Sequence, residues 1–408
     1  MSGKEPNYKK LQARRQILMS EIDGAPVTSD DQSDPVIPPG GVAQLNLGLL
    51  APPDPQPEFF EKDSSALQDF QGVVANNYRE RDGLSNLFSL WDNIPRFSGL
   101  ALQGRFKSEP GEEPLEIFSH KFEFGDQVCE MVLTPAQINE TINGKLCSVF
   151  YYPGLTEELL ELSLVKMAMD RTELFKSDVG PDRAYGVSFS LSSLRTFMSA
   201  NKRGRTYPEL IRSLQILHKC NLEVRINNVL LASGPILPDL YSYSQRGFKR
   251  NDPNATWAAR FHPMISMSIE DRAYRQYSIE RLMCTHSKSA LVLSKILVTR
   301  ARNISTTVPF RISYLEFVRH CGELQYSRRS DGIRKFIQVA ESLKKFGTLS
   351  RVESKKVIGE RGKVIDVELA LYGSASFIQE VKASHLKERV VSERQEPLPP
   401  AGGKKRPR

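Results

Sequence analysis

The chain repeats one short pattern, in which residues 187–194 (VSFSLSSL) match residues 308–315 (VPFRISYL). The apolar positions coincide, and Ser192 and Ser313 fall at the same position in the two copies. Each copy alternates apolar and polar residues, which is typical of a short half-buried strand. Each then has a serine that is able to cap a helix, followed by apolar residues at helical spacing. The repeat therefore predicts a strand and a helix that occur twice.

The similarity continues beyond these segments. The first copy goes on with a basic turn, a further helix and a strand–turn–strand pattern (residues 201–205, 207–219 and 222–232). The second copy has the same order with a longer turn (residues 322–331, 333–346 and 348–371). Strand, helix, turn, helix and hairpin is the order of a winged helix, whose last helix enters the major groove of DNA. We therefore predict an α+β fold with two tandem winged-helix domains.

Composition sets the expected limits of these domains. Residues 26–57 are rich in Pro, Gly, Asp and Ser and cannot bury enough apolar surface to offset chain entropy. We expect a largely disordered N-terminal region (1–114), a first winged-helix domain (115–268), a second winged-helix domain (269–378) and a flexible basic tail (379–408).

The predicted recognition helices carry basic and amide side chains. If Ile333, Phe336 and Leu343 face inward, the 3.6-residue period puts Arg334 and Gln338 on the opposite face. These residue types read guanine and adenine edges. For any one of them an ordinary solvated helix face is the usual explanation, whereas matching faces in two copies favour DNA. The predicted DNA-contacting residues are Lys202, Arg203, Arg205, Arg212, Gln215, Lys219, Arg328, Arg329, Arg334, Lys335, Gln338, Lys345, Lys355 and Lys356.

The charge balance agrees with an anionic partner. The 408 residues carry a formal net charge of +8 with a pI near 9.1, and phosphate contacts supply most non-specific DNA affinity. The five cysteines form no C-x-x-C pair and the six histidines are scattered, so we expect no metal and no cofactor. No P-loop motif occurs, and no constellation meets the roles of an active site. We therefore predict a protein that is not an enzyme.

The sequence also bears on the compartment. No apolar run approaches the roughly 20 residues that cross a bilayer. The first ten residues (MSGKEPNYKK) lack the apolar core of a signal peptide, and the widely spaced cysteines suit a reducing compartment. We expect a cytoplasmic protein without a membrane partner.

Several segments resemble plasmid replication initiator proteins of the twin winged-helix, iteron-binding type. Residues 274–283 (YRQYSIERLM) and 287–291 (SKSAL) resemble the start of the second winged helix in that family, whereas residues 150–154 and 257–263 resemble parts of the first. The resemblance covers roughly residues 115 to 375 and consists of packing patterns. Ser294 to Val298 lacks the aromatic and histidine-rich pattern of close relatives, which leaves the subgroup and the DNA site open.

The resemblance implies a non-enzymatic protein that binds repeated double-stranded DNA sites at a plasmid origin. It also implies recruitment of the host initiator and the host replicative helicase. Members of the family often form a homodimer through the first domain, and that dimer represses its own gene.

Two apolar segments near the N-terminus have a possible partner of their own. Gln44, Leu45, Leu47 and Leu49 resemble the Gln-Leu-x-Leu-x-Leu peptide by which bacterial proteins bind the sliding clamp. Leu84 to Phe88 resembles the shorter form of that peptide but has no glutamine. Short apolar peptides in a polar segment suit docking into a pocket. Local packing on the first domain is the alternative for both segments.

Two other functional classes remain open. A winged-helix transcription regulator would have the same DNA-binding surface but no contact with helicase or clamp. A DNA-processing enzyme would need a metal or nucleotide site. Tandem repeats and an A·T-rich stretch beside the gene would favour the initiator over both.

Overall fold

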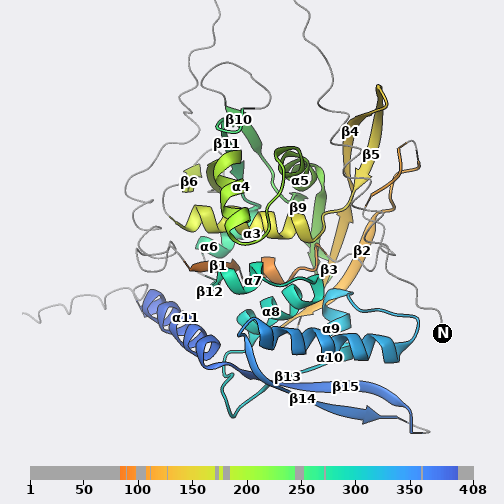
Figure 1. Cartoon of the computed structure of the whole chain (residues 1–408), viewed down its shortest axis with the longest axis vertical. Coiled ribbons are helices and arrows are strands. Elements are labelled where there is room, and N and C mark those ends of the chain that lie inside the picture. The colour runs from red at the N-terminus through yellow and green to blue at the C-terminus, as the bar shows by residue number, and fades with distance from the viewer. Residues whose placement is uncertain are drawn as a thin grey trace, which may run out of the picture. The chain divides into compact units, whose positions relative to one another are not determined.

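The computed structural model (Figure 1) describes residues 83–88, 90–97, 107–110, 112–125, 127–170, 174–177, 184–243, 252–270, 273–359 and 362–393. The chain divides into two compact units, residues 1–56 and 57–408, and every described residue belongs to the second. These residues form a mixed α/β fold. The predicted clamp peptide at residues 44–49 and the basic end of the tail lie outside the described residues.

A four-stranded antiparallel sheet runs in the order β2–β3–β8–β9, so β9 is an edge strand. Its strands are β2 (Phe118–Phe124), β3 (Gln127–Thr134), β8 (Asn221–Ile226) and β9 (Val229–Pro235). In β3, Cys129, Met131 and Leu133 are buried while the residues between them are more exposed, and this alternation gives the sheet one core face. A separate hairpin of β4 (Ala136–Ile142) and β5 (Lys145–Tyr151) follows β3 along the chain.

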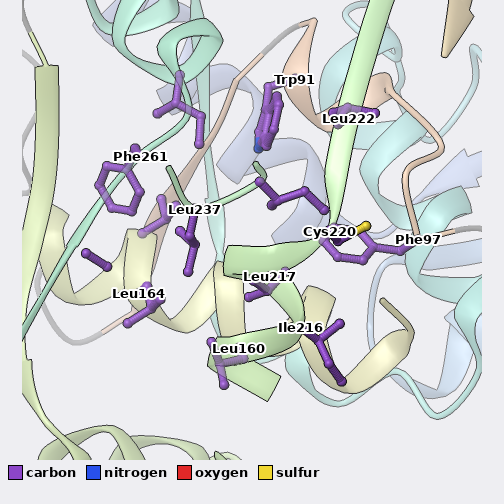
Figure 2. Packing of buried hydrophobic residues seen from close by; sticks show 14 of the residues in the cluster. Trp91, Phe97, Leu160, Leu164, Ile216, Leu217, Cys220, Leu222, Leu237 and Phe261 are labelled. Atoms are coloured by element: carbon purple, nitrogen blue, oxygen red, sulfur yellow. The ribbon is translucent and has the colours of Figure 1, made fainter. Parts of the chain in front are cut away.

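The buried helix α3 (Leu155–Met169) lies at the centre of the largest hydrophobic core. Figure 2 shows its Leu160 and Leu164 in one cluster with Ile216 and Leu217 of α5. The helices around it are α4 (Leu191–Ala200), α5 (Tyr207–Lys219) and α6 (Pro263–Glu270). A second sheet in the order β10–β11–β7–β6 consists of β10 (Leu240–Tyr243), β11 (Thr256–Arg260), β7 (Ala184–Ser190) and β6 (Leu174–Ser177).

A smaller core forms around the C-terminal elements. They begin with β12 (Tyr274–Ser278), α7 (Ile279–Met283) and α8 (Lys288–Arg300). A three-stranded sheet in the order β13–β15–β14 consists of β13 (Phe310–Ser313), β15 (Val364–Gly373) and β14 (Leu349–Ile358). The helices α9 (Tyr314–Cys321) and α10 (Arg329–Lys345) connect β13 to β14. Phe317 of α9 and Phe336 of α10 stack in this core with ring centroids 5.0 Å apart.

The predicted repeat is present in the order of the elements, but its cap lies two residues earlier than expected. Ser190, and not Ser192, caps α4, and its side chain accepts a hydrogen bond from Ser193 N at 2.9 Å. The strand β7 ends at Ser190, so Ser192 already lies in the first turn of the helix. Ser313 caps α9 as expected, accepting from Glu316 N at 3.1 Å.

The corrected alignment brings the two sets of buried side chains into register. When Ser190 is set opposite Ser313, Leu194 falls opposite Phe317 and Leu217 falls opposite Ala340, and all four side chains are buried. We call β7, α4, α5, β8 and β9 the first repeat, and β13, α9, α10, β14 and β15 the second repeat.

Residues 84–88 and 90–97 are folded, although they lie within the N-terminal region (1–114) that we expected to be largely disordered. The strand β1 (Leu84–Phe88) pairs antiparallel with β12, and the short 3-10 helix η2 (Trp91–Asn93) follows. Leu87, Phe88 and Trp91 are buried. The core of the chain covers these side chains, so the structure gives no support to a docking peptide at Leu84 to Phe88, and the segment packs locally, on β12 as well as on α3.

Buried charges connect η2 with helices from both cores. Lys295 Nζ of α8 lies 3.1 Å from Asp92 Oδ1 and 3.1 Å from Glu158 Oε1 of α3. Arg96 pairs with Glu161, also of α3. Removing one partner of a buried pair leaves an uncompensated charge, so such pairs accept few alternative arrangements. They fix α8 against α3.

The helix α11 (Ala375–Glu393) corrects the other expected boundary, because residues 379–393 belong to it and not to a flexible tail. Val381 and Ser384 of α11 are buried. Ser384 Oγ accepts a hydrogen bond from Gln276 N of β12 at 3.0 Å. Contact with β12 therefore orders this part of the chain.

Candidate nucleic-acid interface

The helix α10 presents an open polar face. Arg334, Lys335, Gln338 and Lys345 are exposed, whereas Phe336 between them is buried, as the helical period predicts. Arg334 Nη2 lies 2.9 Å from Asp331 Oδ1, yet the Arg334 side chain is 71% exposed. An exposed ion pair of this kind contributes little and leaves the guanidinium available to a partner. This face has the residue types that contact base edges in a major groove.

Close packing against α9 fixes the way in which α10 is presented. A Cβ on Gly332 would lie 2.1 Å from the hydroxyl oxygen of Tyr314, so only glycine permits this approach. The Tyr314 hydroxyl donates to Leu324 O at 2.8 Å. No side chain caps the first turn of α10, and Arg328 and Arg329 are exposed beside it. The N–H groups of that turn and the two arginines together suit a phosphate.

The hairpin β14–β15 lies beside the start of α10. Arg329 Nη1 donates to Ile365 O of β15 at 3.2 Å. Lys355 and Lys356 of β14 are exposed, like the six predicted residues of α10 and its N-cap. The structure thus brings the predicted DNA-contacting residues of the second repeat onto two connected, solvent-exposed elements.

Arg203 is half-buried and has partners within the chain. Its Nε donates to Met283 O at 2.7 Å, and its Nη2 donates to Thr285 O. Burial lowers the pKa of Arg203 from its usual value. The guanidinium therefore joins the turn after α4 to the end of α7.

The hairpin β4–β5 lies against the outer face of α5, which sequence reasoning did not anticipate (Figure 1). Arg212 Nε lies 3.1 Å from Glu140 Oε1 of β4, and the Tyr151 hydroxyl donates to the same oxygen at 2.6 Å. Burial and this hydrogen bond raise the pKa of Tyr151. Gln215 is half-buried and lines a groove between α5 and β4 with Ile138. The face of α5 that corresponds to the open face of α10 is thus flanked by a β-ribbon.

The other predicted residues of the first repeat are spread over its surface. Lys202 and Lys219 are exposed at opposite ends of the turn and α5. Arg205 is half-buried, and its Nη2 donates to Thr156 Oγ1 at 3.3 Å. The structure therefore does not gather these residues into one face.

Sequence reasoning omitted one basic residue of the exposed α10 surface. Lys344 is exposed and pairs with Glu341 on the same helix. Its basic side chain next to the predicted Lys345 was the available signal, whereas the helical period was not, because adjacent helical residues point in different directions. Glu140 had no local signal, because it meets Arg212 only through the tertiary contact of β4 with α5.

Within the described residues, no group of three or more His, Cys, Asp or Glu side chains is arranged to hold a metal ion. No helix within the same ranges is long and apolar enough to cross a membrane. The five cysteines are free thiols.

Comparison with known proteins gives structural neighbours only. No family model matches the sequence, and no curated protein matches it. The structure is similar to a selenomethionine derivative of domains 2 and 3 of RctB, with a TM-score of 0.39 and 9% identity over 69% of this chain and 96% of that chain. It is also similar to the Pi initiator protein in complex with iteron DNA, with a TM-score of 0.37 and 13% identity over 59% of this chain and 98% of that chain.

At TM-scores of 0.37 and 0.39, neither structure assigns a role to a side chain of this chain.

Proposed function

We propose that the protein is a plasmid replication initiator that binds repeated double-stranded DNA sites, with α10 as the helix that reads base sequence. The observation that carries the proposal is the open face of α10, with Arg334 and Gln338 exposed and the N-terminus tied to a basic hairpin. A helix that enters a major groove needs such a face, and a hairpin beside it meets the backbone. No catalytic step is part of this function.

Two winged helices form the architecture of this proposal. In the second repeat, β13 pairs with β15 and β15 pairs with β14, so strand, two helices and hairpin close into one small unit. The first repeat keeps the order and the buried positions, although its strand β7 pairs with β11 and β6. The net charge of +8 favours association with DNA for the whole chain.

The test is a titration of the full chain on duplex DNA that carries the tandem repeats beside its gene. Random duplex of equal length is the competitor, at two salt concentrations. Stepped complexes that resist the competitor are expected. Equal binding to both duplexes would overturn sequence-specific recognition, and an absence of binding would overturn DNA binding itself.

A transcription regulator would bind the same repeats, so a second measurement separates the two classes. Permanganate footprinting of supercoiled DNA detects opening of an A·T-rich stretch beside the repeats. An initiator, assisted by the host initiator and helicase, opens that stretch. Binding without opening in the presence of these host proteins would favour the regulator.

The proposed homodimer has a candidate surface in the first repeat. The edge strand β9 exposes Val229, Leu230 and Leu231, and an exposed apolar edge is a template for a strand of another chain. We assign this edge to a second copy. Sedimentation of Leu230→Lys should show loss of the dimer, whereas Leu146→Lys, an exposed leucine of the hairpin β4–β5, should leave it intact. A dimer that persists in Leu230→Lys would exclude this surface.

A further inference from the structure

The far end of the hairpin β14–β15 is aliphatic, although it projects into solvent. The exposed fractions are 39% for Val357, 64% for Ile358, 39% for Val364 and 39% for Ile365. Ile358 and Val364 are cross-strand partners in the last pair of the hairpin. Gly359 makes room for Ile365, because a Cβ there would lie 2.6 Å from Ile365 Cγ2. We call these four residues the hairpin tip.

The surroundings of the hairpin tip are basic. Residues 355–365 include Lys355, Lys356, Arg361 and Lys363 but only one acid, Glu360. The acids nearer the base of the hairpin are already engaged. Asp366 Oδ1 accepts from Leu315 N at 3.2 Å, and Glu368 Oε1 lies 2.7 Å from Arg311 Nη1. An aliphatic end framed by cations thus faces solvent.

The hairpin of the first repeat shows that exposure alone does not define the partner. The hairpin β8–β9 also exposes aliphatic residues, at Val229 and Leu230. Its residues 223–231 contain one acid and one base, Glu223 and Arg225, which pair at 3.3 Å. That end is neutral and suits an apolar protein surface. The charge around the hairpin tip of β14–β15 instead suits a polyanion with apolar groups inside it.

Double-stranded DNA has this combination in its minor groove. Phosphates line the groove, and aliphatic side chains that enter it wedge between base steps and kink the duplex. The ten residues of β14 span about 30 Å at about 3.3 Å per residue, which exceeds the width of a groove. Arg329 ties the start of α10 to Ile365, so the hairpin tip moves with the helix that reads the major groove.

We propose that the hairpin tip inserts Val357, Ile358, Val364 and Ile365 into the minor groove beside the site read by α10 and bends the duplex there. This inference rests on the proposed DNA-binding function. It adds a mechanical role, because aliphatic side chains inserted between base steps partly unstack them and kink the duplex. Lys355, Lys356 and Lys363 hold the phosphates on either side.

The experiment uses the full chain and a duplex recovered by the protein itself from a random pool. Dyes at the two duplex ends report bending by energy transfer, and a titration reports affinity. In the double variant Ile358→Ser with Val364→Ser, the bend should be lost and affinity should fall about tenfold. The dependence of affinity on salt should stay unchanged, because no charge is removed. Val308→Ser, at a residue that is 54% exposed before β13, is the matched control and should change neither quantity.

A second pair of substitutions separates charge from insertion. The double variant Lys355→Ala with Lys356→Ala should make the affinity less dependent on salt, by the amount that corresponds to about two phosphate contacts. The bend of the duplex should remain unchanged. A wild-type protein that holds its duplex straight, or a serine variant that still bends it, overturns the inference while DNA binding stands. A wild-type protein that recovers no duplex overturns both. Self-association is also measured in the absence of DNA. If the serine variant no longer self-associates, the hairpin tip is a protein interface, which would also overturn the inference.

Discussion

The two repeats have the same helices but different surroundings. In both, the second helix is buried at matching positions, with Leu217 of α5 opposite Ala340 of α10. The outer face of α10 is open to solvent, whereas that of α5 contacts the strand β4 and pairs through Arg212 with Glu140. The repeated sequence thus specifies a helix–turn–helix twice. The elements around each copy leave the outer face of α10 open and cover part of the outer face of α5.

The strands show the same division. In the second repeat, β13 pairs with β15, so the leading strand closes onto its own hairpin. In the first repeat, β7 pairs with β11 and β6, and the hairpin β8–β9 joins β3 instead. The first repeat is therefore built into two larger sheets, while the second remains a compact unit.

The first way to break the comparison is to disrupt the close packing of α10 on α9 in the second repeat, which depends on Gly332. Gly332→Ala should destabilise the protein by about 3 kcal/mol, because the new methyl group displaces the buried Tyr314 hydroxyl from Leu324 O. Chemical denaturation monitored by circular dichroism measures this loss. Gly234→Ala in β9, where a Cβ meets no atom within 4 Å, is the control and should cost less than about 0.5 kcal/mol. Equal stability of the two variants would contradict the close packing of α9 on α10.

The features of the two repeats that depend on local sequence patterns could be predicted from the sequence. The limits of α5 and the open face of α10 follow from helical periodicity. The position of β4 over α5 and the pairing of β1 with β12 do not, because they depend on strand partners far apart in the chain. The cap at Ser190 was missed for a subtler reason: several serines follow one another, and only the end of β7 decides between them.

Acid should lower the stability of the folded chain through two buried histidines, His262 and His320. Burial, followed by the charge of Arg96, lowers the pKa of His262 to about 3. Burial, followed by the charge of Arg300, lowers the pKa of His320 to about 3. Below the unfolded value of about 6.5, the unfolded chain binds a proton that the folded chain does not, so stability falls as pH falls.

At pH 5 the loss is about 2 kcal/mol for each of these histidines relative to pH 7.5. Denaturation at both pH values, in wild type and in His262→Gln and His320→Gln separately, measures it. Each variant should show about half of the decrease in unfolding free energy that the two histidines together cause between pH 7.5 and pH 5. Burial raises the pKa of Glu161 and of Glu380, which favours the folded state as pH falls, so the comparison of each variant with wild type is the test. Variants with the same change in stability as wild type would contradict the burial of both rings.

The DNA-binding roles of the two second helices should also differ. Arg334→Ala is expected to weaken binding to the selected duplex by roughly 1–3 kcal/mol and to relax preference at one base position. Arg212→Ala should weaken selected and random duplex alike by less than about 1 kcal/mol, because Glu140 already pairs with this arginine. Competition titrations measure both.

Arg319→Ala is the matched control for Arg334→Ala. Arg319 is 62% exposed and pairs with Glu123 at 3.2 Å, but it lies on α9 and not on the proposed reading face. Its substitution should leave sequence preference unchanged. Equal losses of affinity for Arg334→Ala on selected and random duplex would make Arg334 a phosphate contact. The proposed difference between α10 and α5 in reading base sequence would then be lost.

The smallest expected effect tests whether Glu140 is what makes α5 different. This carboxylate lies 3.1 Å from Arg212 Nε and 3.9 Å from Lys107 Nζ, so it neutralises cations beside α5 and repels phosphate. Glu140→Gln should keep the hydrogen bond from Tyr151 and raise affinity for random duplex by less than about 1 kcal/mol. Removing any acid increases the net charge. Glu130→Gln on β3, which replaces the hydrogen-bond partner of Ser119, therefore measures how much this increase alone raises the affinity. A gain in Glu140→Gln beyond that of Glu130→Gln would show that the ribbon suppresses DNA contact by charge. Equal gains would show that the charge of Glu140 does not limit contact between α5 and DNA, and would leave the shape of the hairpin β4–β5 as the proposed difference from α10.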